Sequence, residues 1–305
     1  MTALTSARRR SGGPTSGERC HVCREALSAS HRSRRWEIDI ARCRGCGTVT
    51  AMGAAGIVEA DLSTTTEQTD WNTYDATMHT DESLRYDVLA EVRSRIPPGD
   101  QPPLLFDVGA GTGAFLDMAR SRGFGVSGND ISPSAVAYAS QRYGVDLSSA
   151  DLSEQAEQSC DAITMWCVLA HVGQPREFLG AAFRMLRPGG VLFLRTPRWC
   201  WADAVAHSGR RVPGNRAARL ADNRLTRGHL RLYTDGAMET LLTDVGFCDV
   251  EVQPVAHTGC TGAEIARRLR GPVAVQRLSA RTVDGLVGSG RGPRNSMFVY
   301  ARRSS

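Results

Sequence analysis

The chain of 305 residues contains no lysine, because all 37 of its basic residues are arginine. This absence excludes mechanisms that need a lysine amine, such as Schiff-base chemistry and the phosphate contact of a P-loop lysine. Long apolar runs are absent too, and none approaches the ~20 residues that a membrane-spanning helix requires. The early basic run Arg8-Arg9-Arg10 has no apolar stretch after it, so we expect no signal peptide and a cytoplasmic protein.

Nine cysteines in a reducing compartment indicate thiols and metal ligands rather than disulfides. Four of them form two C-x₂-C pairs that are separated by nineteen residues. Each tight turn directs two sulfurs at one tetrahedral ion, which predicts a zinc site held by Cys20, Cys23, Cys43 and Cys46. Four thiolates close the coordination shell, so we expect this zinc to be structural.

The net charge of +5 conceals an uneven distribution along the chain. Residues 1–46 carry a net charge of +6 and residues 47–195 carry −9, whereas residues 196–231 and 262–303 carry +6 and +7. An acidic central region is therefore flanked by basic segments. Such segments are either a solvated surface or a recognition surface for an acidic substrate.

The central motif is the segment Leu104 to Gly113, with the sequence LLFDVGAGTG. Its apolar start is too short for a helix and is typical of a buried parallel strand. Gly109, Gly111 and Gly113 allow positive φ and let the backbone approach a ligand closely. We expect a helix from Ala114, whose first amides face the same place. The motif predicts a strand–loop–helix cradle for a nucleotide.

The glycines alone also satisfy the G-x-G-x-x-G/A pattern of nicotinamide-dependent enzymes, which stays open as an alternative. Three acidic residues, each at the end of a predicted strand, point elsewhere. Asp107 would repel a pyrophosphate but suit a cation, Asp130 is placed for ribose hydroxyls, and Asp151 for an adenine edge. The strand Asp161–Trp166 brings Trp166 to the same edge of the sheet as a further candidate contact.

The rest of the pattern alternates strands and helices. It predicts an α/β fold with a Rossmann-like sheet of seven strands, the last pair antiparallel. Ser132 and Pro133 predict the start of a helix that Gly144 ends. Further strands are expected at 124–128, 145–147, 191–194, 247–252 and 297–301, and further helices at 81–96, 175–186 and 234–245.

Composition divides the chain into a disordered tail at 1–18, a zinc-binding module at 19–50, a linker and capping helix at 51–98, and a main domain at 99–305. Residues 196–228 lack periodicity and are expected to be an insertion that shapes the acceptor pocket. Tyr74 is a candidate lid over the cofactor, with packing on the sheet edge as the alternative. Residues 262–281 predict a basic helix.

The three acidic residues, together with Arg187-Pro188-Gly189-Gly190 before a later strand, resemble class I S-adenosylmethionine (SAM)-dependent methyltransferases. The resemblance spans roughly residues 104–247. It implies a methyltransferase fold and SAM as the cofactor. The residues that would bind SAM are Asp107, Gly109, Gly111, Gly113, Asp130, Asp151 and Trp166.

The order of cysteine pairs, linker helix, glycine loop, Leu-x-His and His-Leu-x-x-Tyr is similar to one subfamily that methylates small molecules and includes deoxysugar C-methyltransferases. Those sugar enzymes pair Glu with His as the base, whereas here Gly228 precedes His229. We therefore expect O- or N-methylation of a small molecule in natural-product or sugar biosynthesis. The alternatives are an RNA methyltransferase whose zinc module delivers the substrate, and a SAM-binding protein without catalysis.

An acceptor hydroxyl or ammonium needs a base, and neutral imidazole suits proton removal near pH 7. The candidates are His229 and His171. For an anionic or nucleotide-linked acceptor, Arg198 and Arg231 are expected to converge on it, because guanidinium binds planar oxyanions in bidentate fashion. Tyr233 is the third candidate substrate contact.

Overall fold

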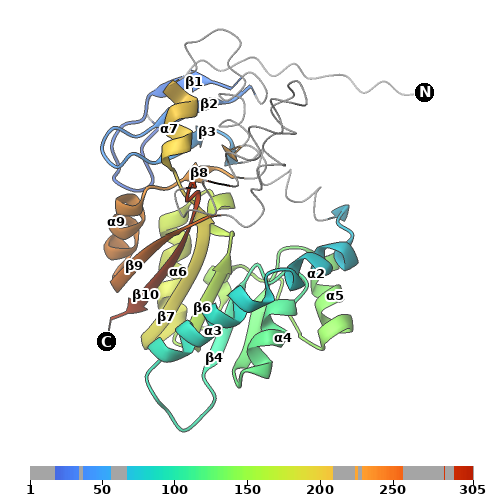
Figure 1. The fold of residues 1–305 in the computed structure, drawn as a ribbon. Coiled ribbons are helices and arrows are strands. Elements are labelled where there is room, and N and C mark those ends of the chain that lie inside the picture. The colour runs from blue at the N-terminus through green and yellow to red at the C-terminus, as the bar shows by residue number, and fades with distance from the viewer. Residues whose placement is uncertain are drawn as a thin grey trace, which may run out of the picture.

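The structure, a computed structural model, describes residues 18–33, 37–55, 67–208, 224–225, 229–256, 285 and 292–304. Within these residues the main body is a six-stranded sheet in the order β5-β4-β6-β7-β10-β9, with helices on both faces (Figure 1). The first four strands in this order are parallel, and β10 is antiparallel to both of its neighbours. Their bounds are β4 Leu104–Val108, β5 Gly125–Asn129, β6 Cys160–Trp166, β7 Leu186–Pro197, β9 Phe247–Val255 and β10 Ser296–Arg303. The predicted Rossmann-like α/β fold with an antiparallel last pair is confirmed.

The predicted count of seven strands is wrong for the described residues. The expected strand at 145–147 is reduced to one parallel bridge between Asn129 and Ser148. Ser148 N donates to Gly128 O at 2.9 Å and Asp130 N donates to Ser148 O at 3.0 Å, so the segment lies beside β5 without a ladder. The apolar run there is only three residues long and is interrupted by Asp146, which is too short to sustain a strand.

Two apolar cores lie on opposite faces of the sheet because successive strand residues alternate in direction. Leu105 packs on one face with α3 and α4, whereas Phe106 packs on the other face with α6 and α9. The helices of the main body are α2 Trp71–His79, α3 Glu82–Arg95, α4 Ala114–Ser121, α5 Pro133–Tyr143, α6 Pro175–Met185, α7 Trp201–Ser208 and α9 Asp235–Val245, with the short 3₁₀ turns η1 Leu152–Glu154 and η2 Leu169–His171.

The predicted helix signals around α5 are confirmed. The Ser132 side chain accepts a hydrogen bond from Ala135 N, Pro133 occupies the first turn, and Gly144 ends the helix in the left-handed conformation at φ 61°. None of the helices in the described ranges is long and apolar enough to cross a membrane.

Residues 18–33 and 37–52, which we call the cysteine module, contain three short antiparallel strands, β1 Ala29–Arg32, β2 Asp39–Arg42 and β3 Val49–Met52. The module lies over one end of the main sheet, next to α7 (Figure 1). Its sheet continues through β3 into β8 Arg231–Leu232, a strand that comes from the main body. The sheet of the module is therefore continuous with a strand of the main body.

Several sequence expectations fall outside the described residues. They are the tail apart from Glu18, the middle of the insertion at 209–223 and 226–228, and the basic helix at 262–281.

Candidate active site

The glycine loop between β4 and α4 has a backbone conformation and close contacts that leave no room for a Cβ atom. Gly109 and Gly113 both have positive φ, at 65° and 79°. A Cβ on Gly109 would come within 2.8 Å of Val168 Cγ2, and one on Gly113 within 3.0 Å of Ala139 Cβ. Gly113 also caps the N-terminus of α4, where Ala114 N donates to Thr112 Oγ1 at 3.4 Å. The amides of Gly109 and Gly111 donate to the side chains of Asn129 and Asp130, so what the loop offers a ligand at the carboxyl edge of the sheet is close approach of the backbone.

Asp130 holds this loop in place. Its Oδ2 accepts a hydrogen bond from Gly111 N at 2.8 Å and its Oδ1 accepts one from Ser132 N at 2.9 Å. The carboxyl group is 9% exposed, and burial raises its pKa. Each carboxylate oxygen can accept a second hydrogen bond, so Asp130 retains acceptor capacity for ligand hydroxyls.

Asp107 is a more deeply buried carboxyl group, only 2% exposed at the end of β4. Its Oδ1 accepts a hydrogen bond from Thr164 Oγ1 at 2.6 Å. Burial raises the pKa of Asp107 to about 7, and the hydrogen bond from Thr164 and the charge of Arg85 oppose that rise. A neighbouring cation would stabilise the ionised form further, in line with the expectation that Asp107 suits a cation.

Arg85 on α3 is a further candidate site residue that sequence reasoning missed. It is 7% exposed, its guanidinium lies 4.6 Å from the centre of the Trp166 ring, and it is attracted by Asp107. Its Nε donates to Met78 O at 3.2 Å, and a buried arginine that a buried carboxyl group attracts is a candidate for a functional site. Within α3, however, its sequence surroundings are those of an ordinary surface helix, so no local signal identified it.

The side chains of Trp166 and Asp151, two predicted cofactor contacts, both interact with neighbouring protein residues. Trp166 packs against the rings of Phe115 and Phe193, with centroids 5.2 and 5.0 Å apart, so it forms part of the floor beneath Arg85. Asp151 is exposed and accepts hydrogen bonds from Ser153 at the start of η1. Both still lie at the carboxyl edge where cofactor contacts are predicted.

Tyr74 on α2 lies over the glycine loop. A Cβ on Gly111 would be 3.5 Å from Tyr74 Cε1, and the ring is 41% exposed. The helix that carries it is held mainly by polar contacts to α5, including Trp71 Nε1 to Ser134 Oγ at 3.0 Å and Tyr143 Oη to Asp75 Oδ2 at 2.7 Å. The role of Tyr74 as a lid over the cofactor stays a prediction, with packing as the alternative.

The structure brings the two candidate bases together. His171 ends η2, after the loop that follows β6, and its ring centre lies 5.0 Å from that of His229. His229 Nδ1 lies 3.0 Å from the carbonyl oxygen of Arg224. If the Nδ1 atom carries the proton, this contact leaves Nε2 as the basic atom of the neutral ring.

Two of the three predicted substrate contacts have partners within the protein instead, and the third is buried. Arg198 Nη2 donates to Asp235 Oδ2 at 2.6 Å, so its charge is already paired. Arg231 is 4% exposed and donates to the carbonyl oxygens of Val172 and Gly173. Tyr233 is fully buried, which raises its pKa to about 12. The expectation that the two arginines converge on an acceptor therefore loses its support.

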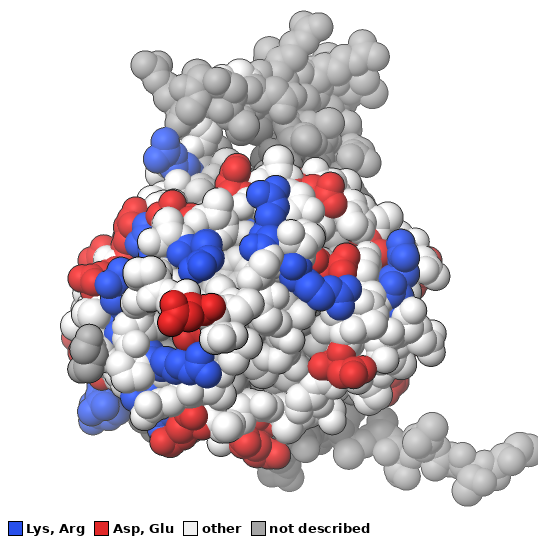
Figure 2. Space-filling view, turned by 90° about the horizontal axis from the view of Figure 1, so that it is seen from below, with Lys and Arg blue, Asp and Glu red and all other residues white. Residues whose placement is uncertain are grey.

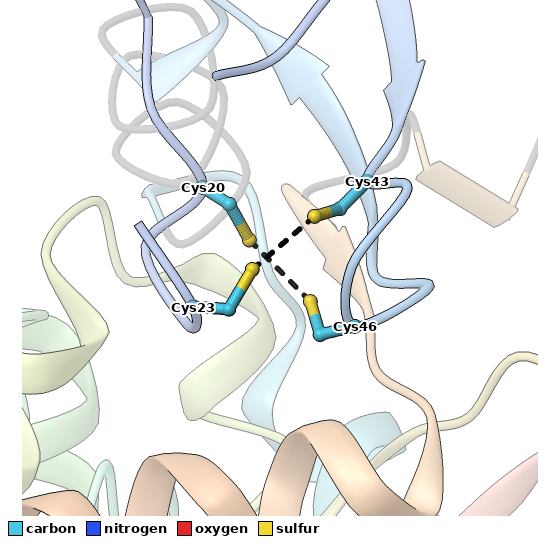
Figure 3. A group of neighbouring side chains, drawn as sticks. All are labelled: Cys20, Cys23, Cys43 and Cys46. Atoms are coloured by element: carbon cyan, nitrogen blue, oxygen red, sulfur yellow. Dashed lines mark hydrogen bonds between the residues drawn. The ribbon is translucent and has the colours of Figure 1, made fainter. Parts of the chain in front are cut away.

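The four predicted metal ligands meet at one point (Figure 3). Their Sγ atoms all lie within 4.8 Å of one another, with Cys20 and Cys46 at 3.5 Å and Cys23 and Cys43 at 3.3 Å. Tetrahedral zinc with Zn–S bonds of about 2.3 Å places neighbouring sulfurs about 3.8 Å apart. This donor set fits a zinc ion.

Comparison with known proteins agrees with this geometry. The model of a family described as a methyltransferase domain matches residues 81–252, more than half of the chain. A ubiquinone biosynthesis O-methyltransferase of Pseudomonas entomophila is 34% identical over 100 residues, which cover 30% of this chain and 43% of that protein. A protein named as a probable S-adenosylmethionine-dependent methyltransferase of Mycolicibacterium smegmatis is 27% identical over 183 residues, 59% of this chain and 65% of that one. The chain thus spans less than two thirds of either relative.

Among solved structures, the 1,6-didemethyltoxoflavin-N1-methyltransferase of Burkholderia thailandensis has a similar fold. That structure contains 1,6-didemethyltoxoflavin and S-adenosylhomocysteine. It matches with a TM-score of 0.53 at 17% sequence identity, covering 91% of this chain and all of that one.

Proposed function

The chain belongs to the class I SAM-dependent methyltransferases, and on this premise we propose that it methylates an oxygen or nitrogen atom of a small molecule. The observation that carries the proposal is the His171–His229 pair, whose rings lie 5.0 Å apart beside the carboxyl edge of the sheet. O- and N-methylation require loss of an acceptor proton, and imidazole is the side chain best suited to take it near neutral pH. Two of the three proteins described above are named as an O- and an N-methyltransferase, which supports the same class of acceptor.

The residues proposed to hold SAM are the glycine loop, Asp107 and Asp130. The glycine loop lets the backbone approach the polar end of the cofactor closely, Asp130 suits its ribose hydroxyls, and Asp107 suits its cationic part. When bound, SAM supplies an electrophilic methyl group. Arg85 adds a positive charge beside Asp107, which suits the cofactor carboxylate.

The catalytic work of the chain is then positioning and proton removal. Holding acceptor and donor in line is worth ~7–11 kcal/mol of the barrier. We propose that His229 accepts the acceptor proton through Nε2, because its Nδ1 faces the Arg224 carbonyl. His171, on the neighbouring turn, would stabilise the charge that this proton transfer creates and would help to hold the acceptor.

Transfer of labelled methyl groups tests this function. The full chain would be incubated with methyl-labelled SAM and a panel of phenols, carboxylic acids, amines and nucleotide-linked sugars. We expect label on an O or N atom of one class. Labelling of a carbon atom alone would contradict the proposal.

An RNA acceptor is a further outcome of the same assay. RNA that accepts label and binds with a steep salt dependence would replace the small-molecule proposal. The face opposite the cysteine module carries interspersed acidic and basic side chains (Figure 2), so this side does not favour a long phosphate backbone.

We also propose that zinc occupies the four-cysteine site and serves a structural role. Elemental analysis of purified protein should give about one zinc per chain. The double replacement Cys43→Ser with Cys46→Ser should remove it, whereas Cys248→Ser, which lies on β9 of the main sheet, should leave it in place. Zinc that survives the double replacement would disprove the assignment.

A further inference from the structure

Strand β8 connects the cysteine module to the segment that carries His171. On one side β8 pairs with β3, with Thr50 opposite Arg231, and Ala51 N donates to Leu230 O at 2.9 Å. On the other side Leu230 N donates to Ala170 O at 2.7 Å. The carbonyl group of Leu230 thus bonds to the module, and its N–H group bonds to η2. His229 directly precedes Leu230 in the chain, and His171 directly follows Ala170.

Arg231 strengthens the connection on the η2 side. Its Nη1 donates to Val172 O at 2.6 Å and its Nη2 donates to Gly173 O at 2.8 Å. These carbonyls belong to the two residues that follow His171. The planar guanidinium fits two adjacent acceptors, and only 4% of the residue is exposed, so the contacts are protected from water. Arg231 therefore fixes the C-terminal side of the turn that ends in His171.

The metal-binding loops are attached to the other end of β8. Thr234 Oγ1 donates to Cys46 O at 2.8 Å, and a Cβ on Gly47 would come within 3.2 Å of Thr234 Cγ2. Tyr233, between this threonine and β8, is fully buried in the same apolar core as Cys20 and Cys43. The geometry of the second cysteine pair is thereby linked to the backbone of residues 229–234.

We infer that the cysteine module and Arg231 together position the His171–His229 pair. The metal site fixes the loop at Cys46, that loop and β3 fix β8, and β8 with Arg231 fixes η2. Arg231 is a positioning residue, because it acts through the turn that carries His171. The catalytic consequence rests on the proposed function of the histidines, but the positioning itself is measurable without any acceptor.

Nuclear Overhauser effects between the imidazole protons of His171 and His229 report the pairing directly. They would be recorded on the full chain, histidine-labelled, loaded with zinc and saturated with S-adenosylhomocysteine (SAH). We expect a strong cross-peak in the wild type, at least twofold loss in Arg231→Gln, and partial recovery in Arg231→Lys, which keeps a donor. The SAH dissociation constant should stay within twofold in all three. An undiminished cross-peak in Arg231→Gln would overturn the role of Arg231.

A pair of variants at Thr234 tests the link to the metal site even if Arg231→Gln does not fold. Thr234 also caps α9 by accepting from Ala237 N at 3.2 Å. Thr234→Asp keeps this cap but cannot donate to Cys46 O, whereas Thr234→Ser keeps both contacts. We expect the cross-peak to weaken in Thr234→Asp and to persist in Thr234→Ser.

Two results would overturn the inference: a full cross-peak in Thr234→Asp, or loss of SAH affinity in parallel with every loss of the cross-peak. The latter would mean that the module only stabilises the whole fold. Failure of the proposed base role would be seen separately, as normal methyl transfer by His229→Ala with the cross-peak results in Arg231→Gln and Thr234→Asp unaffected.

Discussion

The two sides of the candidate active site are built in different ways. The cofactor side consists of the loop at 109–113 and of carboxyl groups that come from neighbouring strands, and its hydrogen bonds join residues up to 57 positions apart. The acceptor side joins residues 46–51, 170–173 and 229–234, which are separated by up to 188 positions. The first side depends on local backbone geometry, whereas the second depends on how two sheets meet. A substitution should therefore be able to damage one side without the other.

The charges differ between the two sides as well. The cofactor side places buried carboxyl groups next to a buried arginine, Arg85. On the acceptor side, Arg231 donates to backbone carbonyl groups and Arg198 pairs with Asp235. The titratable side chains proposed to act there are the imidazoles of His171 and His229. The cofactor side is thus suited to a ligand with both charges, and the acceptor side to proton transfer.

The largest expected effect separates the two sides by catalysis. His229→Ala should lower kcat by ~10²–10⁴-fold, because the acceptor loses its base, while SAH binds as in the wild type. Steady-state kinetics with the acceptor that the labelling panel identifies, together with calorimetry, would measure both quantities. His31→Ala is the matched control, since this ring lies on β1 against His207. Equal losses of kcat and SAH affinity in His229→Ala would contradict the separation.

A smaller effect should appear in the pH dependence of cofactor binding. Burial raises the pKa of Asp107 to about 7, so the carboxyl group is mostly neutral at pH 6 and mostly ionised at pH 8. If only the ionised form attracts the ammonium group of SAH, affinity should rise about tenfold between these pH values. Calorimetry across this range would measure the rise.

Asp107→Asn should bind SAH more weakly and without this dependence. An equal pH dependence in wild type and variant would assign the titration to another group. The acceptor-side variant His171→Ala should retain the wild-type pH dependence, which sharpens the contrast between the two sides.

The smallest expected effect concerns the lid. Tyr74→Ala exposes Gly111 and should weaken SAH binding about two- to fivefold, which corresponds to ~0.5–1 kcal/mol of lost contact. Tyr74→Phe keeps the ring and should bind as the wild type does. Equal binding by all three proteins, measured by calorimetry, would show that α2 does not cover the cofactor.

The cofactor side could be predicted from the sequence because its signals are local. Each of these signals acts over a few residues: the glycines of the loop, the N-cap at Ser132 and the helix end at Gly144. The C-x₂-C spacing is a local signal of the same kind for the four cysteines. The prediction of a seventh strand was wrong because the residues at 145–147 carry no signal for how few backbone pairs the segment forms. The fold class was predictable because strand and helix periodicities are also local.

The acceptor side was only partly predictable. The sequence indicated His171 and His229 as chemistry-bearing residues but could not show that they meet, because their contact depends on β8 joining a sheet of the cysteine module. Arg231 looked like a substrate contact because its sequence position is near His229. Its actual partners, the carbonyls of Val172 and Gly173, lie about sixty residues earlier and carry no sequence signal.

Calorimetry with SAH on Asp130→Ala and Arg231→Gln tests the central claim, that the cofactor and acceptor sides are separate structures. Asp130→Ala removes the acceptor for Gly111 N and the proposed ribose contact, so it should lose at least tenfold in SAH affinity. Arg231→Gln should stay within twofold of the wild type. Unchanged binding by Asp130→Ala, or an equal loss in both variants, would contradict the account.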